Sequence, residues 1–286
     1  MSSVAASLDH LGVAGRDLAA LAAAYERLGF TLTPLARHSG RRTPEGPIEP
    51  FATGNRCVML REGYLELIAI LDPARYSDMR AALERGAGLY IIALGMDDEA
   101  ANLARLRRAG IDLPGAAYLE RPVDDADPRS PIARFARLPL PDAPEGKLQL
   151  VRHFTPEAIW QTRFLDHANR AEALAEVILA VESPAEAGAR FSRLAGLPLV
   201  PDPAGGLRLD LARGAVRLLP PESLPRVLPG ITVPSLPFIA GMALRTADRG
   251  AAIRRRLAER GVPHREHDDA VMVAAEACGG ASLLFR

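Results

Sequence analysis

The feature that most constrains the fold of this chain is a supersecondary pattern that occurs four times. In the first copy, LDHLGV predicts a strand, and DLAALAAAYERLGF predicts a helix with Asp17 as its N-cap and Gly29 at its end. The segments FTLTPLA, RCVMLREG and GYLELIAIL then predict three strands, the last two forming a hairpin. The order is therefore strand, helix and three strands.

Further copies begin near Leu89, Ala175 and Phe238, which gives a period of roughly 70–80 residues. The four helices end alike, in RLGF, RAGI, LAGL and ERGV, where glycine follows an apolar stripe. The helix of one such unit covers only one face of its sheet, so the units are expected to pair. We expect an α+β fold of four βαβββ modules, paired into two domains whose curved mixed sheets form cups.

The copies predict two domains joined by a link that contains the single tryptophan, Trp160. Consecutive modules are expected to pair, and pairing of the first module with the fourth and the second with the third is the alternative. The expected parts are domain 1 (1–155, with modules 7–72 and 88–154), a link (156–173), and domain 2 (174–286, with modules 174–222 and 237–286).

Charge and composition exclude several classes of partner. Lys+Arg and Asp+Glu both number 35, so no net field attracts nucleic acid or an anionic membrane. No apolar run is long enough to span a membrane, and the first residues do not have a signal-peptide pattern. The two cysteines form no CxxC pair and indicate a reducing compartment. We expect a cytoplasmic protein with a small-molecule substrate, and a homodimer is left open.

Two stretches of the first module, LDHLGVAGRDLAALAAAYERLGF and GYLELIAILDP, resemble the glyoxalase-like group of the vicinal oxygen chelate superfamily. HFTPEAIW, DHANRA and VESPAEAGARFSRLAG are similar to its two-domain bacterial members. The resemblance covers essentially the whole chain. It implies two glyoxalase-like domains and, in metal-using members, a divalent ion (zinc, nickel, iron or manganese) held by the first and last strands of each module.

The resemblance places ligand positions on His10 and Glu66 in the first module. Strand alternation turns both side chains away from their apolar neighbours and into the cup. In the second module the positions fall on Gln149 and on Tyr90, give or take one residue. The expected metal ligands are His10, Glu66 and Gln149, with Tyr90 as a substrate contact. Without a metal, burial should raise the pKa of Glu66 and make it a general base.

Four further residues are predicted to contact a substrate. His38 and Asn55 match the family's His and Gly-Thr-x-Asn positions, although the order here is Ala-Thr-Gly-Asn. His153 follows Gln149 on the same strand face, about 13 Å away at ~3.3 Å per residue, so it should line the mouth of the cup. His167 lies in the link, which is expected to border the site.

The second cup carries different residues at the corresponding positions. Glu176 and Arg217 are expected in the third module, and Met242 or one of its neighbours, with Leu283, in the fourth. The second cup is therefore expected to be structural, or to bind a ligand without metal.

Two functions follow from the first cup. In one, a metal-assisted lyase, isomerase or dioxygenase acts on a small oxygen-rich substrate, with Glu66 moving the proton. In the other, the cup binds or sequesters a small molecule without metal, as resistance proteins of the superfamily do. Both place Glu66 inside the cup, and they differ in whether a metal is retained.

Overall fold

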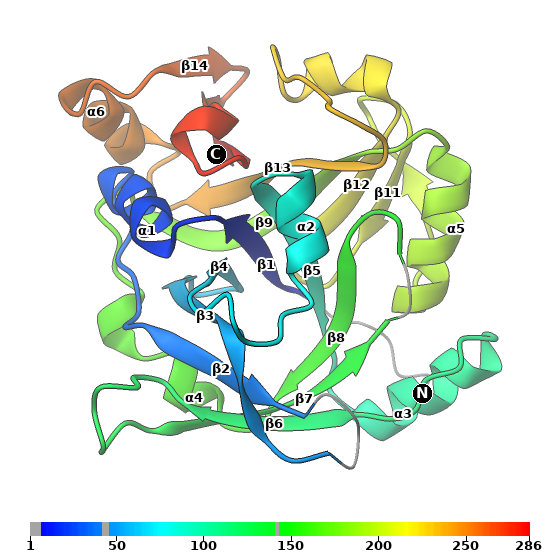
Figure 1. Cartoon of the computed structure of the whole chain (residues 1–286). Coiled ribbons are helices and arrows are strands. Elements are labelled where there is room, and N and C mark those ends of the chain that lie inside the picture. The colour runs from blue at the N-terminus through cyan, green and yellow to red at the C-terminus, as the bar shows by residue number, and fades with distance from the viewer. Residues whose placement is uncertain (1–6, 42–45, 141–142) are drawn as a thin grey trace.

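The structure, a computed structural model, describes residues 7–41, 46–140 and 143–286. Its strands form two eight-stranded mixed sheets (Figure 1). The order is β2-β3-β4-β1-β5-β8-β7-β6 in the first sheet and β10-β11-β12-β9-β13-β16-β15-β14 in the second. The α+β fold expected from the repeat is confirmed.

Each quarter of the chain contributes one strand, one helix and three further strands. The first quarter contains β1 (Ser7–Gly15), α1 (Leu18–Arg27), β2 (Ala36–Gly40), β3 (Glu49–Met59) and β4 (Tyr64–Ile70), followed by α2 (Arg80–Arg85). The second contains β5 (Gly88–Gly95), α3 (Glu99–Arg108), β6 (Ala117–Pro122), β7 (Ile132–Pro139) and β8 (Lys147–His153), followed by α4 (Pro156–Ile159) and η1 (Thr162–Phe164).

The third and fourth quarters repeat this order. The third contains β9 (Ala171–Ala180), α5 (Pro184–Ala195), β10 (Val200–Pro201), β11 (Leu207–Asp210) and β12 (Ala215–Leu219), followed by η2 (Pro221–Arg226). The fourth contains β13 (Phe238–Thr246), α6 (Ala251–Glu259), β14 (His264–His267), β15 (Ala270–Val273), η3 (Ala275–Ala277) and β16 (Ser282–Phe285).

The helix ends have the chemistry that the repeat predicts. The Asp17 carboxylate accepts hydrogen bonds from the first-turn amides of α1 at 2.8 and 3.1 Å. All four glycines of the repeated helix-end signature have positive φ, with values of 92°, 74°, 76° and 60°. The recurrence of glycine in the signature therefore has a physical cause, since only glycine adopts this left-handed conformation without strain. The signature residues are Gly29, Gly110, Gly196 and Gly261.

Consecutive modules share each sheet. β1 pairs antiparallel with β5 in the first sheet, and β9 pairs antiparallel with β13 in the second. The short strands β6, β10 and β14 were less apparent in the sequence. The second strand of the first module also differs from expectation. It was expected at residues 30–36, and the structure places it at Ala36–Gly40. His38 therefore lies on a strand, not in a loop.

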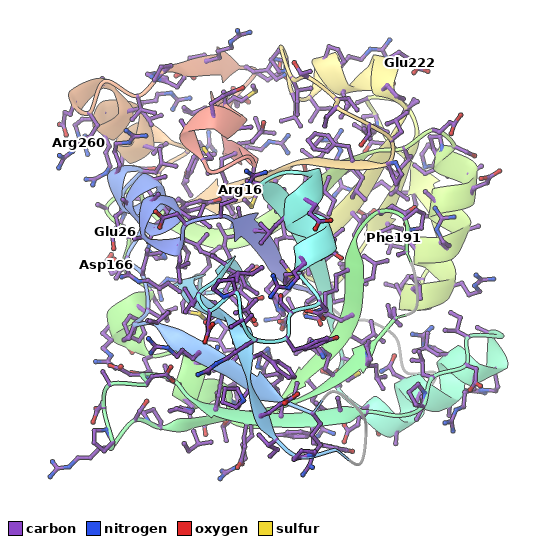
Figure 2. All side chains as sticks on the ribbon, viewed as in Figure 1. Arg16, Glu26, Asp166, Phe191, Glu222 and Arg260 are labelled. Atoms are coloured by element: carbon purple, nitrogen blue, oxygen red, sulfur yellow. The ribbon has the colours of Figure 1, made fainter. Side chains whose placement is uncertain are left out.

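One hydrophobic core joins the two sheets. It contains alternate residues of the central strands, such as Leu65 and Leu67 of β4 and Val177 and Leu179 of β9, together with the apolar stripes of the helices. Figure 2 shows the side chain of Phe191 on the inner side of α5, to which it belongs, whereas the exposed Glu222 lies at the periphery. The opposite face of each sheet is the concave one.

The two concave faces are filled differently. On the second sheet, Leu224, Val227 and Leu228 from η2 and the residues after it pack onto strand residues and form a separate apolar cluster. On the first sheet, the segment at α2 contributes Met79 and Leu83 to a smaller cluster that leaves a cavity open. The first cup therefore keeps a cavity that polar side chains line. None of the helices within the described residues is both long and apolar enough to cross a membrane.

The junction between the first two modules predicts a specific effect on stability. Gly12 of β1 lies opposite Ile91 of β5, and a Cβ atom on Gly12 would be 2.7 Å from the Ile91 Cβ atom. Gly12→Ala should lower the free energy of unfolding by about 1–3 kcal/mol, the usual cost of overpacking a core. Urea denaturation followed by circular dichroism measures this change.

The matched control is the double variant Gly12→Ala/Ile91→Gly, in which the obstructing side chain, its Cβ atom included, is removed. Coupling between contacting residues predicts that the second substitution costs less in the Gly12→Ala background than in the wild type. Additive effects of the two substitutions would contradict the proposed contact.

Candidate active site

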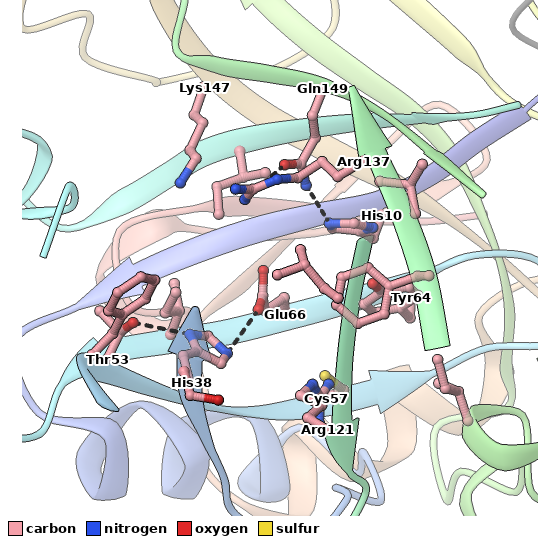
Figure 3. A pocket seen from close by; sticks show the side chains of 18 of the residues that line it. His10, His38, Thr53, Cys57, Tyr64, Glu66, Arg121, Arg137, Lys147 and Gln149 are labelled. Carbon is pink, nitrogen blue, oxygen red and sulfur yellow. Dashed lines mark hydrogen bonds and ion pairs between the residues drawn. The ribbon is translucent and has the colours of Figure 1, made fainter. Parts of the chain in front are cut away.

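The candidate site is a cavity of about 160 Å³ on the concave face of the first sheet. This volume is close to that of an engineered cavity of about 150 Å³ that accommodates benzene, so it suits a small molecule. Most of the sequence-predicted residues meet here: His10, His38, Glu66, Gln149 and His153 all line the cavity (Figure 3).

Glu66 faces this cavity because β4 alternates between the core and the cup. Leu65 and Leu67 lie in the shared core, and the carboxylate between them is turned to the other side. The side chain is only 13% exposed. The Asn55 amide nitrogen donates to its Oε1 atom at 2.5 Å, and His38 Nε2 lies 3.6 Å from the same atom. These polar neighbours offset part of the cost of burying the charge.

The pKa of Glu66 differs from the sequence expectation. Burial by itself raises the pKa of this carboxyl group, but His38, His10, the Asn55 hydrogen bond and Arg121 together lower it below its ordinary value. The expectation of a raised pKa was therefore wrong, because it took account of burial without the charges and the hydrogen-bond donor that surround the carboxylate. Glu66 is ionised at neutral pH.

His38 connects Glu66 to β3. Its Nδ1 atom lies 2.9 Å from Thr53 Oγ1, while Nε2 faces Glu66. Burial lowers the pKa of His38 from 6.5 to about 4, because the attraction of Glu66 does not compensate for the loss of hydration. His38 is therefore a neutral imidazole at physiological pH.

A second hydrogen-bonded chain runs along the opposite side of the cavity. His10 Nδ1 lies 2.7 Å from Asp9 Oδ1, and His153 Nε2 lies 3.2 Å from the same oxygen. Burial opposes ionisation of Asp9, but the hydrogen bonds from the two histidines lower its pKa below the ordinary value. Because a carboxylate only accepts, Nδ1 of His10 carries its proton, and Nε2 accepts from the Gln149 amide 3.2 Å away. The His10 ring also stacks on Tyr64, with 4.4 Å between centroids.

Three of the predicted substrate contacts do not line the cavity, and one of them, Asn55, is 2% exposed and bonded to Glu66. Tyr90 is not among the residues that line the cavity, and its neighbour Ile91 is. His167 is 2% exposed, with Nδ1 accepting from the Thr31 amide at 3.0 Å and Nε2 donating to the Met59 carbonyl at 2.8 Å. It fastens the link to the first module and has no free ring nitrogen for a ligand.

The sequence reasoning missed three cations in the cavity, Arg121 of β6, Arg137 of β7 and Lys147 of β8. Figure 3 shows Arg137 beside Gln149, and Arg121 beside Cys57. On β7, Ala136 and Leu138 lie in the core, while Phe135 and Arg137 face the cavity. The same alternation that identified Glu66 was therefore present in ARFARLPL, and it could have identified Arg137.

The second sheet carries a different set at the equivalent positions. Glu66 of β4 pairs with Gly12 of β1 in the first sheet. In the second sheet Arg217 of β12 takes the place of Glu66, and it pairs with Ile178 of β9. Arg217 is bonded to both Asp202 oxygens at 2.7 and 2.8 Å and to Glu176 at 3.3 Å. These buried groups satisfy one another, so this part of the second cup is held by its own ion pairs.

In the fourth module the neighbour of Met242 takes the expected position, and Leu283 is displaced by one residue. Met242 and Leu283 belong to the shared core. Ala243 and Leu284, which pair with each other, lie in the cluster on the concave face. The sequence could not fix this register because both strands are apolar on both faces.

Comparison with known proteins agrees with this architecture. The profile of the Glyoxalase-like domain matches residues 8–195, and the chain belongs to this family. No curated protein gave a significant match. The chain is similar in fold to a hypothetical protein from Staphylococcus aureus, with 12% identity, TM-score 0.63 and 98% coverage of both chains.

Two further structures of similar fold are those of enzymes. One is a Mn(II)-bound glyoxalase from Novosphingobium aromaticivorans, with 14% identity, TM-score 0.53 and coverage of 99% of this chain and 82% of that one. The other is a mutant of 4-hydroxymandelate synthase from Streptomyces coelicolor, with 14% identity, TM-score 0.56 and coverage of 99% and 93%. At these identities the likeness is one of fold, and the resemblance to the vicinal oxygen chelate superfamily is confirmed.

The donor set does not fit the four-ligand metal site that the resemblance implies. By strand register, Gln149 of the second module corresponds to Glu66 of the first, and Ile91 corresponds to His10. The isoleucine side chain has no atom that can bind a metal. Gln149 Oε1 is turned to Arg137, 3.5 Å away. Among the described residues, no three His, Cys, Asp or Glu side chains are grouped so that they could hold a metal ion. Nearby arginines also oppose a divalent cation.

The pKa of His38 gives a pH-dependent prediction. Since the pKa is depressed in the folded state, the unfolded chain binds more protons between pH 6.5 and about 4. The stability contribution is present above pH 6.5 and lost as the pH falls through this window. Wild type should therefore lose more unfolding free energy than His38→Gln over the same range, by up to roughly 3 kcal/mol.

Urea titrations at closely spaced pH values measure this difference. The ring proton signals of His38, assigned by their absence from the variant, should also titrate near pH 4 in the folded protein. A midpoint near 6.5, with parallel stability curves for the two proteins, would refute this electrostatic account.

Proposed function

We propose that the chain binds a small oxygen-rich carbonyl compound in the first cup and that Glu66 moves a proton on it. The reaction class is that of an isomerase or lyase. The observation that supports this proposal is an ionised carboxylate, held by Asn55 and His38, in a benzene-sized cavity that also contains two arginines. A fixed base beside fixed positive charge suits removal of a proton next to a carbonyl group, because the oxyanion that develops meets preorganised cations.

The lowered pKa of Glu66 limits the substrates that fit. A weak base removes a proton effectively only when the carbon acid is activated, so the carbonyl compound should carry an electron-withdrawing oxygen substituent beside the reacting carbon. Glu66 also remains ionised well into the acidic range, and the rate should change little between pH 8 and pH 5.

A metal-assisted reaction is the second candidate. It is favoured by the bond between His10 Nδ1 and Asp9, since metal-binding histidines commonly donate their other ring nitrogen to a carboxylate. His10 Nε2, Glu66 and Gln149 would hold the ion, which would supply Lewis-acid polarisation. The Mn(II)-bound glyoxalase of similar fold gives this candidate a precedent. A third candidate, sequestration of a small molecule without reaction, uses the same cavity.

Hydrogen exchange measures the proposed proton transfer even when the product is unidentified. Small hydroxy- and oxo-substituted carbonyl compounds are incubated with the protein in D2O, and loss of the signal next to the carbonyl is followed by NMR. Glu66→Gln should reduce the exchange rate by about 10²- to 10⁴-fold, the usual contribution of a general base.

The control is Glu120→Gln, because Glu120 also borders the cavity but is exposed and paired with Arg134 at 3.1 Å. It should exchange at the wild-type rate. Equal rates in wild type and Glu66→Gln would refute the role of Glu66. Binding of compounds without exchange in any protein would favour sequestration.

Metal analysis separates the first two candidates. Protein purified without added metal, and protein dialysed against Mn²⁺, Zn²⁺, Ni²⁺ or Fe²⁺, is examined by elemental analysis. We expect less than about a tenth of an equivalent after removal of free ion, unchanged in His10→Ala, because the set has too few donors. One retained equivalent that is lost in both His10→Ala and Glu66→Ala would establish the metal site instead.

A further inference from the structure

We infer that Arg137 binds a carboxylate group of the ligand, so that the first cup accepts a small organic acid. This inference rests on the proposed function only in placing the ligand in that cavity. It adds the chemical class of the substrate. It also assigns a role in substrate recognition to Arg137, which is not one of the residues at the family's ligand positions.

The guanidinium of Arg137 is incompletely bonded. Its Nε atom is buried and has no hydrogen-bond partner. Its Nη1 atom donates to Gln149 Oε1, at the long distance of 3.5 Å. Among the residues that the structure describes, no carboxylate lies within ion-pair distance of this side chain, although it lines the cavity.

Comparison with the buried Arg217 shows how the bonding of the half-buried Arg137 differs. Arg217, at the equivalent cup of the second sheet, is closed by two short bonds to Asp202 and one to Glu176. A guanidinium stays charged, and leaving its hydrogen-bond donors unpaired away from water is costly. We infer that this protein keeps the Arg137 Nε atom unpartnered because a bound ligand supplies the missing hydrogen bond. The free Nε and a neighbouring Nη form the edge of arginine that takes a carboxylate through two parallel hydrogen bonds.

The surroundings of Arg137 favour a monoanion of small size. Lys147 is paired with Asp78 at 2.5 Å. Among the described side chains that line the cavity, Arg121 and Arg137 are therefore the two arginines or lysines without a carboxylate within ion-pair distance. The ionised Glu66 in the same cavity repels a dianion such as phosphate. The benzene-sized volume excludes nucleotides and other large anions.

Pairs of acids and their amides test the inference directly. Lactate and pyruvate are each compared with lactamide and pyruvamide, and inorganic phosphate is included. Binding is measured by NMR from the ring signals of His10 and His38, which face the cavity. We expect each acid to bind about 10- to 100-fold more tightly than its amide, the range of a charge-assisted hydrogen bond. Equal binding of acid and amide, no binding of either acid, or tighter binding of phosphate would overturn the inference.

Variants identify the residue that reads the charge. Arg137→Gln should lose about 10- to 100-fold in acid affinity and leave amide affinity unchanged. Arg137→Lys keeps the charge without the two-pronged edge and should bind acids with intermediate affinity. The control is Arg134→Gln, since Arg134 lies on the same strand but is exposed and outside the cavity lining. Wild-type acid affinity in Arg137→Gln would refute the assignment, and thermal unfolding confirms that each variant is folded.

Glu66→Gln distinguishes failure of this inference from failure of the proposed function. Removing the Glu66 charge should tighten acid binding, because the carboxylate repels the anion, while it slows exchange by the factor given above. If acids bind through Arg137 but no protein catalyses exchange, the recognition site stands and the proposed reaction fails. If Glu66-dependent exchange occurs only with neutral compounds and acids show no dependence on Arg137, the reaction stands and this inference fails.

Discussion

The alternation of β4 between a buried core and a polar cup is the constraint on which the site depends. Leu65 and Leu67 are buried in the core that joins the two sheets, and this packing fixes the opposite face for Glu66. A shift of one residue in register would expose two leucines to the cup and place a carboxylate in an apolar core. The burial of these leucines therefore keeps the Glu66 carboxylate in the cup, where it is largely shielded from water.

The buried carboxylate in turn determines the electrostatics of the cup. Asn55 and His38 bond or face one of its oxygens, and the nearby positive charge keeps it ionised despite burial. The structure keeps the cations of this cavity partly unpaired, notably Arg137 with its unpartnered Nε. A site of this kind is poised for an anionic, oxygen-rich guest, whose binding completes the hydrogen bonding that the protein leaves open.

The second sheet shows what the same fold becomes when these requirements are absent. Its equivalent positions hold Arg217 and Glu176, which bond to each other, and apolar side chains after η2 fill much of the concave face. Charged groups are buried in both cups, but Arg217 in the second is paired with Asp202 and Glu176, whereas Arg137 in the first has a buried Nε atom without a partner. The difference between a candidate site and a structural interior thus lies in which buried polar groups are left without partners, and not in the topology.

The sequence by itself determined the repeat, the helix ends and the faces of the strongly alternating strands, because these depend on local periodicity and on the backbone freedom of glycine. It therefore identified His10, Glu66 and Gln149 as neighbours in one cup. Only the tertiary structure decided which residue of β5 faces the cavity, that His167 is a structural bond, and that Arg137 enters the site. These outcomes depend on register between strands distant in sequence and on competition among partners for each polar atom, neither of which is encoded in a local pattern.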